Sequence, residues 1–210
     1  MLEYLVVKTD PTAPTLIILH GFGADEYDLI SVAKAFPPLN IISLRAPIEL
    51  PWGGYAWYQL EQTPEGLRGD EVTRLQADQL LTLAIPEVLR AEQLDPSNII
   101  LLGFSQGSAM SYDIVSNPQD GITIKAVVIL SGYIPAKTKE LLLQQNLHDL
   151  PFFISHGEDD DLISLSALDE AKEVLLQAKA EVTANKYPIG HSISDEVLSD
   201  LSRWFSEHHV

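Results

Sequence analysis

The residue best suited to chemistry is Ser105, at the centre of the G-x-S-x-G sequence Gly103-Phe104-Ser105-Gln106-Gly107. An apolar run at residues 99–102 precedes this sequence, and a stretch compatible with a helix follows it. In a sharp strand-to-helix turn of this kind, the serine hydroxyl is exposed at the carboxyl end of the strand. Glycines suit both sides because a Cβ there would crowd the neighbouring strand and helix. The pattern predicts a nucleophile at Ser105; the alternative is a glycine-rich turn without chemistry.

A serine hydroxyl is a weak nucleophile that needs a base, commonly a histidine oriented by a carboxylate. Downstream of Ser105 the chain has His148, His156, His191, His208 and His209. His191 lies between the last predicted strand and the last predicted helix, a loop position that suits a base. His156 directly follows a predicted strand, and the last two histidines belong to a solvated helix end. We therefore predict His191 as the base, ahead of His156.

Four consecutive acidic residues at 158–161 lie just after a predicted strand, between Ser105 and His191. Adjacent carboxylates repel one another, so most of them are expected to be solvated, and one needs to turn toward His191. Composition and order do not choose among Asp159, Asp160 and Asp161. The acids are consecutive rather than spaced at alternate positions as in a calcium loop, so we predict no metal site.

Short apolar runs alternate with longer helical patterns, which indicates a parallel sheet flanked by helices. Runs without polar residues, such as 99–102 and 126–130, are typical of strands covered on both faces. Strands are expected at residues 2–7, 15–19, 41–44, 98–102, 124–130, 152–155 and 181–187. Helices are expected at 27–35, 71–94, 106–115, 137–145, 165–179 and 195–208, with Pro86 bending or interrupting the second. No linker or repeat divides the chain, so residues 1–210 are expected to form one domain.

Residues 45–70 are predicted to be neither helix nor strand, because prolines and glycines recur throughout them. A long loop in a compact domain is usually functional. The segment also contains Trp52, Tyr55, Trp57 and Tyr58. These rings are expected either to line a substrate pocket or to pack the loop onto the body of the protein.

The composition excludes several classes of function. Among 210 residues the chain has 13 basic and 30 acidic side chains, a formal net charge of −17, and no cysteine. This charge disfavours nucleic acid and anionic membranes as partners, and the lack of cysteine excludes thiol nucleophiles, disulfides and thiolate metal sites. Dinucleotide and phosphate-loop motifs are missing, so no nucleotide cofactor is expected. No secretory signal is visible at the N-terminus, which favours a cytoplasmic protein.

Together these motifs resemble the phospholipase/carboxylesterase family of serine α/β-hydrolases, which includes acyl-protein thioesterases. The resemblance covers nearly the whole chain and rests on residues 19–25, 103–107, 130–135, His156-Gly157-x-x-Asp160 and Gly190-His191-Ser192, in the family's order. It implies an α/β-hydrolase fold with a mostly parallel sheet of about seven strands and no large cap domain. It also implies that Asp160 is the acid, with Asp159 in reserve, and that the backbone N–H groups of Phe22 and Gln106 form an oxyanion hole.

The resemblance implies a serine carboxylesterase that hydrolyses short- to medium-chain acyl esters through an acyl-enzyme intermediate, without a metal or organic cofactor. The small-molecule ester is expected to contact Trp57, Tyr58, Leu67, Tyr133 and Ile163. The alternatives are acyl-protein thioesterase or lysophospholipase activity, and a non-catalytic ligand-binding protein on the same fold. Membrane insertion is not expected because the apolar runs are far shorter than ~20 residues, and a homodimer is left open.

Overall fold

A seven-stranded sheet forms the centre of the computed structural model, which describes residues 2–10, 12–33, 36–63 and 66–208. Its strands are β1 (Tyr4–Val7), β2 (Thr15–Leu19), β3 (Asn40–Leu44), β8 (Ile99–Phe104), β9 (Ile124–Leu130), β10 (Pro151–Gly157) and β11 (Glu181–Tyr187). Their order across the sheet is β1-β3-β2-β8-β9-β10-β11. β1 pairs antiparallel with β3, and every other neighbouring pair is parallel. The predicted seven-stranded, mostly parallel sheet is confirmed.

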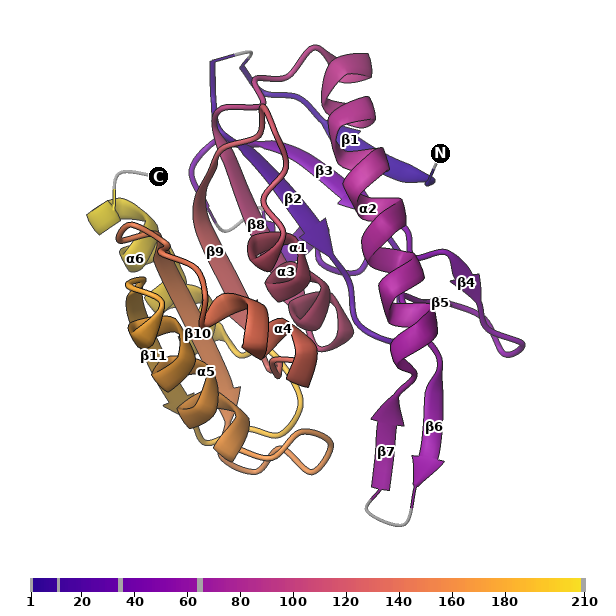
Figure 1. The fold of residues 1–210 in the computed structure, drawn as a ribbon. Helices are drawn as coiled ribbons and strands as arrows, with labels where there is room; N and C mark the ends of the chain where they lie inside the picture. Colours follow the sequence, from indigo (N-terminus) through magenta and orange to yellow (C-terminus); the bar gives the residue numbers. More distant parts are fainter. Residues whose placement is uncertain (1, 11, 34–35, 64–65, 209–210) are drawn as a thin grey trace.

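Helices cover both faces of this sheet (Figure 1). They are α1 (Ile30–Ala33), α2 (Glu71–Glu92), α3 (Gln106–Ser116), α4 (Ala136–Leu142), α5 (Ser166–Gln177) and α6 (Asp195–His208). Buried side chains of α2, α3, α4 and α5 share one apolar cluster with alternate residues of the strands. Those of α1 and α6 share a second cluster with the strand residues in between. In β2, for example, Ile17 and Leu19 face the first cluster, and Leu16 and Ile18 face the second.

The segment 45–70 differs from the prediction of irregular structure, because it contains four short strands. β4 (Ile48–Glu49) pairs with β5 (Tyr55–Ala56), and β6 (Leu60–Thr63) pairs with β7 (Gly66–Gly69), each in antiparallel fashion. The turn between β4 and β5 contains Gly53 and Gly54 at φ values of 98° and 75°, which glycine adopts without strain. The same prolines and glycines that suggest a loop thus form the turns of two hairpins. Figure 1 shows the β6–β7 hairpin projecting beyond the edge of the sheet.

Two helices can be compared with their predicted form. α2 continues through Pro86, so of the two predicted effects of this proline, a bend or an interruption, the interruption is wrong, although proline removes one helix hydrogen bond. Its buried face includes Leu81, Ile85 and Val88 on both sides of the proline, so tertiary packing holds the helix together. α1 spans four residues rather than the predicted 27–35, of which 34–35 lie outside the described residues.

Candidate active site

Ser105 occupies a strained turn between β8 and α3. Its φ of 54° and ψ of −114° lie outside the regions that residues with a side chain normally adopt. Such strain persists only where the surrounding structure imposes it, and it is concentrated at functional sites. The Ser105 N–H donates to Leu130 O at 3.0 Å, which ties the turn to the end of β9. Its side chain is left at the carboxyl end of the sheet, directly before the N-terminus of α3.

The glycines of the turn are required by close backbone contacts. A Cβ on Gly103 would lie 2.4 Å from Gly107 O, and a Cβ on Gly107 would lie 1.9 Å from Leu19 O. Both separations are far below van der Waals contact, so neither position accepts a side chain without displacement of the backbone. Helix α3 can therefore pack closely against β2 only because residue 107 is glycine.

Asp160 and His191 form a close pair beside this turn. Asp160 Oδ2 lies 2.7 Å from His191 Nδ1, and Asp160 Oδ1 accepts hydrogen bonds from the backbone N–H groups of Leu162 and Ile163. Burial acts to raise the pKa of Asp160, but these hydrogen bonds and His191 together lower it below its usual value. The carboxylate is therefore ionised and holds the proton of His191 on Nδ1. The neighbouring Asp159 has an exposed side chain.

His191 Nε2 is left without a partner among the described residues, and the ring packs against Phe104 with 5.0 Å between ring centroids. Ser105 and His191 line the same cavity. Ser105 Oγ makes no hydrogen bond with His191 or with any other residue that the structure describes. Hydrogen bonds between catalytic groups are often long in unliganded enzymes and tighten when substrate binds.

His156, the second histidine considered as a base, is buried and contacts the loop that carries Asp160 instead of lining the cavity. Its Nε2 donates to Ile163 O at 2.9 Å and lies 3.5 Å from Asp160 Oδ2. It therefore fixes the loop that carries Asp160 and presents Ile163 to the cavity. The His156-Gly157-x-x-Asp160 pattern is the sequence signal that could have indicated this role.

The loop after β2 is held by residues on either side of the β4–β5 hairpin. His20 is fully buried; its Nε2 accepts from Ala46 N–H at 3.1 Å, so Nδ1 carries the proton and donates to Gly21 O. Burial lowers the pKa of His20, which favours this neutral form. Trp57 Nε1 donates to His20 O at 2.8 Å. These contacts position Phe22, whose backbone N–H has no acceptor among the described residues.

Gln106 is the first residue of α3, and its backbone N–H is likewise free of any described acceptor. Its side chain is fixed: Oε1 accepts from Trp57 N–H at 3.0 Å, and Nε2 donates to Tyr58 O at 2.9 Å. The free N–H groups of Phe22 and Gln106 thus belong to two segments that are each braced by residues 57–58. Donors fixed in advance can stabilise negative charge without reorganisation.

A cavity of about 690 Å³ adjoins Ser105 and His191. Of the side chains expected to contact substrate, Tyr58, Tyr133 and Ile163 line it. Trp57 differs from the expectation: it is fully buried behind the cavity, where its indole N–H bonds to His20 O. The side chain of Leu67 lies outside the part that the structure describes. The cavity lining also includes Phe22, Leu60, Phe104, Ile134, Pro135 and Leu162.

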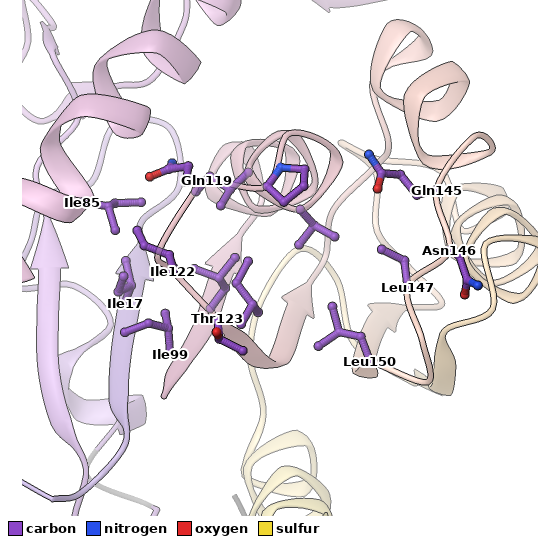
Figure 2. Close-up of a pocket in the computed structure, with 15 residues that line it drawn as sticks. Ile17, Ile85, Ile99, Gln119, Ile122, Thr123, Gln145, Asn146, Leu147 and Leu150 are labelled. Atoms are coloured by element: carbon purple, nitrogen blue, oxygen red, sulfur yellow. The ribbon is translucent and has the colours of Figure 1, made fainter. Parts of the chain in front are cut away.

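A second cavity, of about 230 Å³, lies near the opposite, amino ends of the strands (Figure 2). Ile17, Ile85, Ile99 and Leu150 are among the aliphatic side chains around it. No histidine, acidic residue or serine lines it among the described residues, so it offers no groups for hydrolytic chemistry. Within the described ranges there is also no cluster of three His, Asp or Glu side chains that could hold a metal ion.

A buried ionic network below the first cavity has no counterpart in the sequence predictions. Arg74 Nη1 bonds to both carboxylate oxygens of Asp113 and to Thr138 Oγ1, and Thr138 donates to Asp113. Arg74 and Asp113 are both buried. Their side chains come from α2 and α3, so the pair connects two helices at the floor of the cavity. No local pattern indicates such a pairing 39 residues apart.

Comparison with known proteins identifies the family of this chain. The family model described as Phospholipase/Carboxylesterase matches residues 2–209. The chain belongs to this family. The probable carboxylesterase SOBER1-like of Arabidopsis thaliana is 29% identical over 94% of this chain and 80% of its own length. Acyl-protein thioesterase 1 of Aspergillus fumigatus is 28% identical over 97% of this chain and 91% of its own. The resemblance stated from the motifs is confirmed.

The fold of this family member is the α/β-hydrolase fold without a cap. The crystal structure of the Bacillus cereus carboxylesterase superposes with a TM-score of 0.87, covering 99% of this chain and 95% of that one at 22% identity. By its family match, the chain is a hydrolase of the carboxylesterase and thioesterase family. Among its described residues, no helix combines the length and the apolar character needed to cross a bilayer.

Proposed function

We propose that the chain is a serine carboxylesterase in which Ser105, His191 and Asp160 form the catalytic triad. The observation that carries the proposal is the 2.7 Å contact between Asp160 Oδ2 and His191 Nδ1, beside a cavity that Ser105 also lines. With the proton on Nδ1, His191 has its Nε2 lone pair available to accept a proton. The positive φ of Ser105 and the free N–H groups of Phe22 and Gln106 support the same assignment.

In the first half of the reaction, Ser105 Oγ attacks the ester carbonyl carbon while its proton passes to His191 Nε2. Asp160 stabilises the charged imidazole without accepting the proton. The carbonyl oxygen becomes an oxyanion that accepts hydrogen bonds from the N–H groups of Phe22 and Gln106, and one such donor contributes about 3 kcal/mol. Collapse of the intermediate breaks the bond to the alcohol oxygen, which takes the proton from His191.

In the second half, His191 removes a proton from water, and the resulting hydroxide attacks the acyl group on Ser105. The same oxyanion hole stabilises the second tetrahedral intermediate. Its collapse releases the carboxylic acid and returns the proton to Ser105 Oγ. The chain's own residues provide the nucleophile, the base and the oxyanion donors, so the proposal includes no metal or organic cofactor.

The cavity supports a small-molecule ester as substrate. Its aromatic and aliphatic lining suits a short or medium acyl chain. Thioester hydrolysis is the second candidate. It is favoured by the relative named acyl-protein thioesterase 1 and by a mechanism that can release either an alcohol or a thiol. Rates on a series of p-nitrophenyl esters and acyl thioesters of matched chain length separate the two: a maximum at palmitoyl thioesters would replace the esterase proposal.

The triad is tested by fluorophosphonate labelling and by turnover of p-nitrophenyl butyrate. We expect wild-type protein to be labelled once, on Ser105, and Ser105→Ala to lose both labelling and turnover. Ser206→Ala is the matched control, because Ser206 is exposed on α6 and bonds only to Ser202 O within that helix. An unlabelled wild-type protein that still binds esters would instead support a ligand-binding protein on this fold.

A further inference from the structure

Positively charged side chains gather in the cavity beside Ser105. Arg68, Arg74 and Lys137 line it, whereas Glu71 is the only acidic side chain in its lining among the described residues. In the whole chain the balance is reversed, with 13 basic against 30 acidic residues. Basic side chains, which are the minority in the chain, therefore outnumber acidic ones in the cavity where substrate is proposed to bind.

Arg74 offers hydrogen-bond donors rather than net charge. Its Nη1 is engaged by Asp113 and Thr138, and the ion pair with Asp113 offsets its charge. Nε and Nη2 bond to no described residue. Neither is among the fully buried atoms without a partner, and Arg74 lines the cavity. A guanidinium has five N–H donors in a planar fork, so three remain for a further acceptor. A planar carboxylate is the acceptor that fits such a fork best.

Arg68 and Lys137 supply the net charge. Both side chains are exposed, and neither forms an ion pair with a residue that the structure describes. Glu61 lies opposite Arg68 across the β6–β7 hairpin but is not within ion-pair distance of it and does not line the cavity. Together with Glu71, the lining still has an excess of positive charge that an incoming anion can neutralise.

The two arginines lie on the Tyr133 side of the cavity. Burial raises the pKa of the Tyr133 hydroxyl, and the hydrogen bond with Tyr58 and the charges of Arg74 and Arg68 oppose this rise. Tyr58 and Tyr133 hydroxyls lie 2.9 Å apart. The alcohol of an ester must lie at His191, which protonates it. The acyl chain is therefore the part of the substrate left to fill the rest of the cavity, whose lining includes Arg68 and Arg74.

We propose that the preferred substrate is an ester whose acyl chain carries a carboxylate, that is, a monoester of a dicarboxylic acid. Arg74 Nε and Nη2 bind the carboxylate, and Arg68 and Lys137 attract and neutralise it. This inference rests on the proposed esterase function and specifies its substrate class. The net charge of −17 repels such an anion at long range, but at physiological ionic strength this repulsion is screened beyond about 8 Å. The positive lining then dominates inside the cavity.

The test compares methyl esters that differ only in the terminal group of the acyl chain. Monomethyl succinate, glutarate and adipate are each paired with the methyl ester of the corresponding monoamide, which has the same number of heavy atoms and no charge. Methanol release is followed by proton NMR. We expect kcat/KM to be about tenfold higher for at least one acid than for its amide, the order of one charge-assisted hydrogen bond.

Variants at the exposed cations test the cause of this preference. In the Arg68→Gln, Lys137→Gln double variant the acid-to-amide ratio should fall clearly below the wild-type value without reaching one, because Arg74 still donates to the carboxylate, and added salt should lower the wild-type ratio in the same direction. Lys172→Gln is the matched control, because it removes a positive charge from the exposed face of α5, away from the cavity, and should keep the ratio. Arg74 is left intact because its removal would leave Asp113 buried and unpaired.

Three results would overturn the inference: a ratio at or below one for every chain length, a ratio that the double variant keeps, or a preference seen only when the carboxylate is in the alcohol, as in the acetyl ester of 3-hydroxypropanoate against its amide. If p-nitrophenyl butyrate is still hydrolysed, the esterase function stands and only the substrate class is rejected. If Ser105 is not labelled and no ester is hydrolysed, the proposed function fails and the inference fails with it.

Discussion

The indole Nε1 of Trp57 donates a hydrogen bond of 2.8 Å to the backbone oxygen of His20, and both side chains are fully buried. This contact connects the β4–β5 region to the loop after β2, where the N–H of Phe22 has no acceptor in the described part of the chain. Trp57 also uses its backbone N–H to fix the Gln106 side chain. One residue thus braces both segments that carry the proposed oxyanion donors, although it does not line the cavity.

Trp57→Phe should therefore lower catalysis more than binding. The change keeps an aromatic ring but leaves the His20 carbonyl without its donor, at a stability cost of about 1–3 kcal/mol. We expect kcat on p-nitrophenyl butyrate to fall by about 10- to 100-fold, with little change in KM, as the oxyanion donors lose their position. Trp52→Phe is the control because Trp52 is 73% exposed. Equal kinetics in both variants would contradict the bracing role.

Asp160→Asn should lower kcat by about 10⁴-fold without loss of the fold, because an amide does not hold the proton of His191 on Nδ1. The measurement is steady-state turnover together with fluorophosphonate labelling rate. Asp159→Asn is a closely matched control, since the exposed neighbour makes no side-chain contact with His191. A large loss in Asp159→Asn and none in Asp160→Asn would reverse the assignment.

The lowered pKa of Asp160 has a consequence for acid stability. A carboxyl group whose pKa is lower in the folded state stabilises the protein above its unfolded pKa. This contribution is lost as the pH falls through the pKa of the folded state, which lies below the unfolded-state pKa of 3.8. Urea denaturation from pH 6 to pH 3 should show a smaller loss of stability for Asp160→Asn than for wild type. Parallel curves would argue against this coupling.

The pKa of Asp78 is shifted in the opposite direction from that of Asp160. Burial, and secondarily the charge of Asp113, raises its pKa from 3.8 to about 6, and its Oδ1 has no partner within the described part of the chain. Its contribution to stability is present below pH 3.8 and is lost as the pH rises through about 6. Asp78→Asn should therefore stabilise the protein at pH 8 by about 1 kcal/mol and have little effect at pH 4. Asp120→Asn, at an exposed site, should change neither value.

Gly107→Ala should abolish the folded state or cost at least about 4 kcal/mol, because the new Cβ would lie 1.9 Å from Leu19 O. Gly190→Ala is the control, since the nearest atom to its Cβ would lie 3.7 Å away, at ordinary contact distance. Thermal unfolding followed by circular dichroism compares the two. A Gly107→Ala protein that melts near the wild-type temperature would mean that α3 can move away from β2.

The strands were the most predictable part of the fold, since short apolar runs rich in β-branched residues, such as Ala126-Val127-Val128-Ile129-Leu130, are typical of strands buried on both faces. The hairpins within 45–70 were missed because strands of two to four residues have too short a pattern to be recognised. The predicted interruption at Pro86 was wrong for a different reason: local propensity disfavours proline inside a helix, but burial on both sides of the proline outweighs one lost hydrogen bond.

The candidate site likewise has residues that the sequence predicts and contacts that it does not. Ser105 and His191 stand out because each lies in a local pattern with a stated chemical purpose. The contacts around them join residues far apart in the chain, such as Trp57 with His20 and Arg74 with Asp113. Nothing in the spacing of these residues indicates their pairing. Trp57 was accordingly expected in the substrate site, where its size and aromaticity would suit an apolar ligand, and it lies behind that site instead.

The projecting β6–β7 hairpin has a consequence for how this hydrolase can change over evolution. Its four register pairs are made within the hairpin itself, and it supplies Arg68 and Leu60 to the cavity, while the proposed nucleophile, base and oxyanion donors lie on other segments. Insertions or substitutions there can alter which acyl chains enter without disturbing the catalytic groups or the core. Selectivity and chemistry are encoded in separable parts of the chain, so new substrate ranges are accessible by changes in one short hairpin.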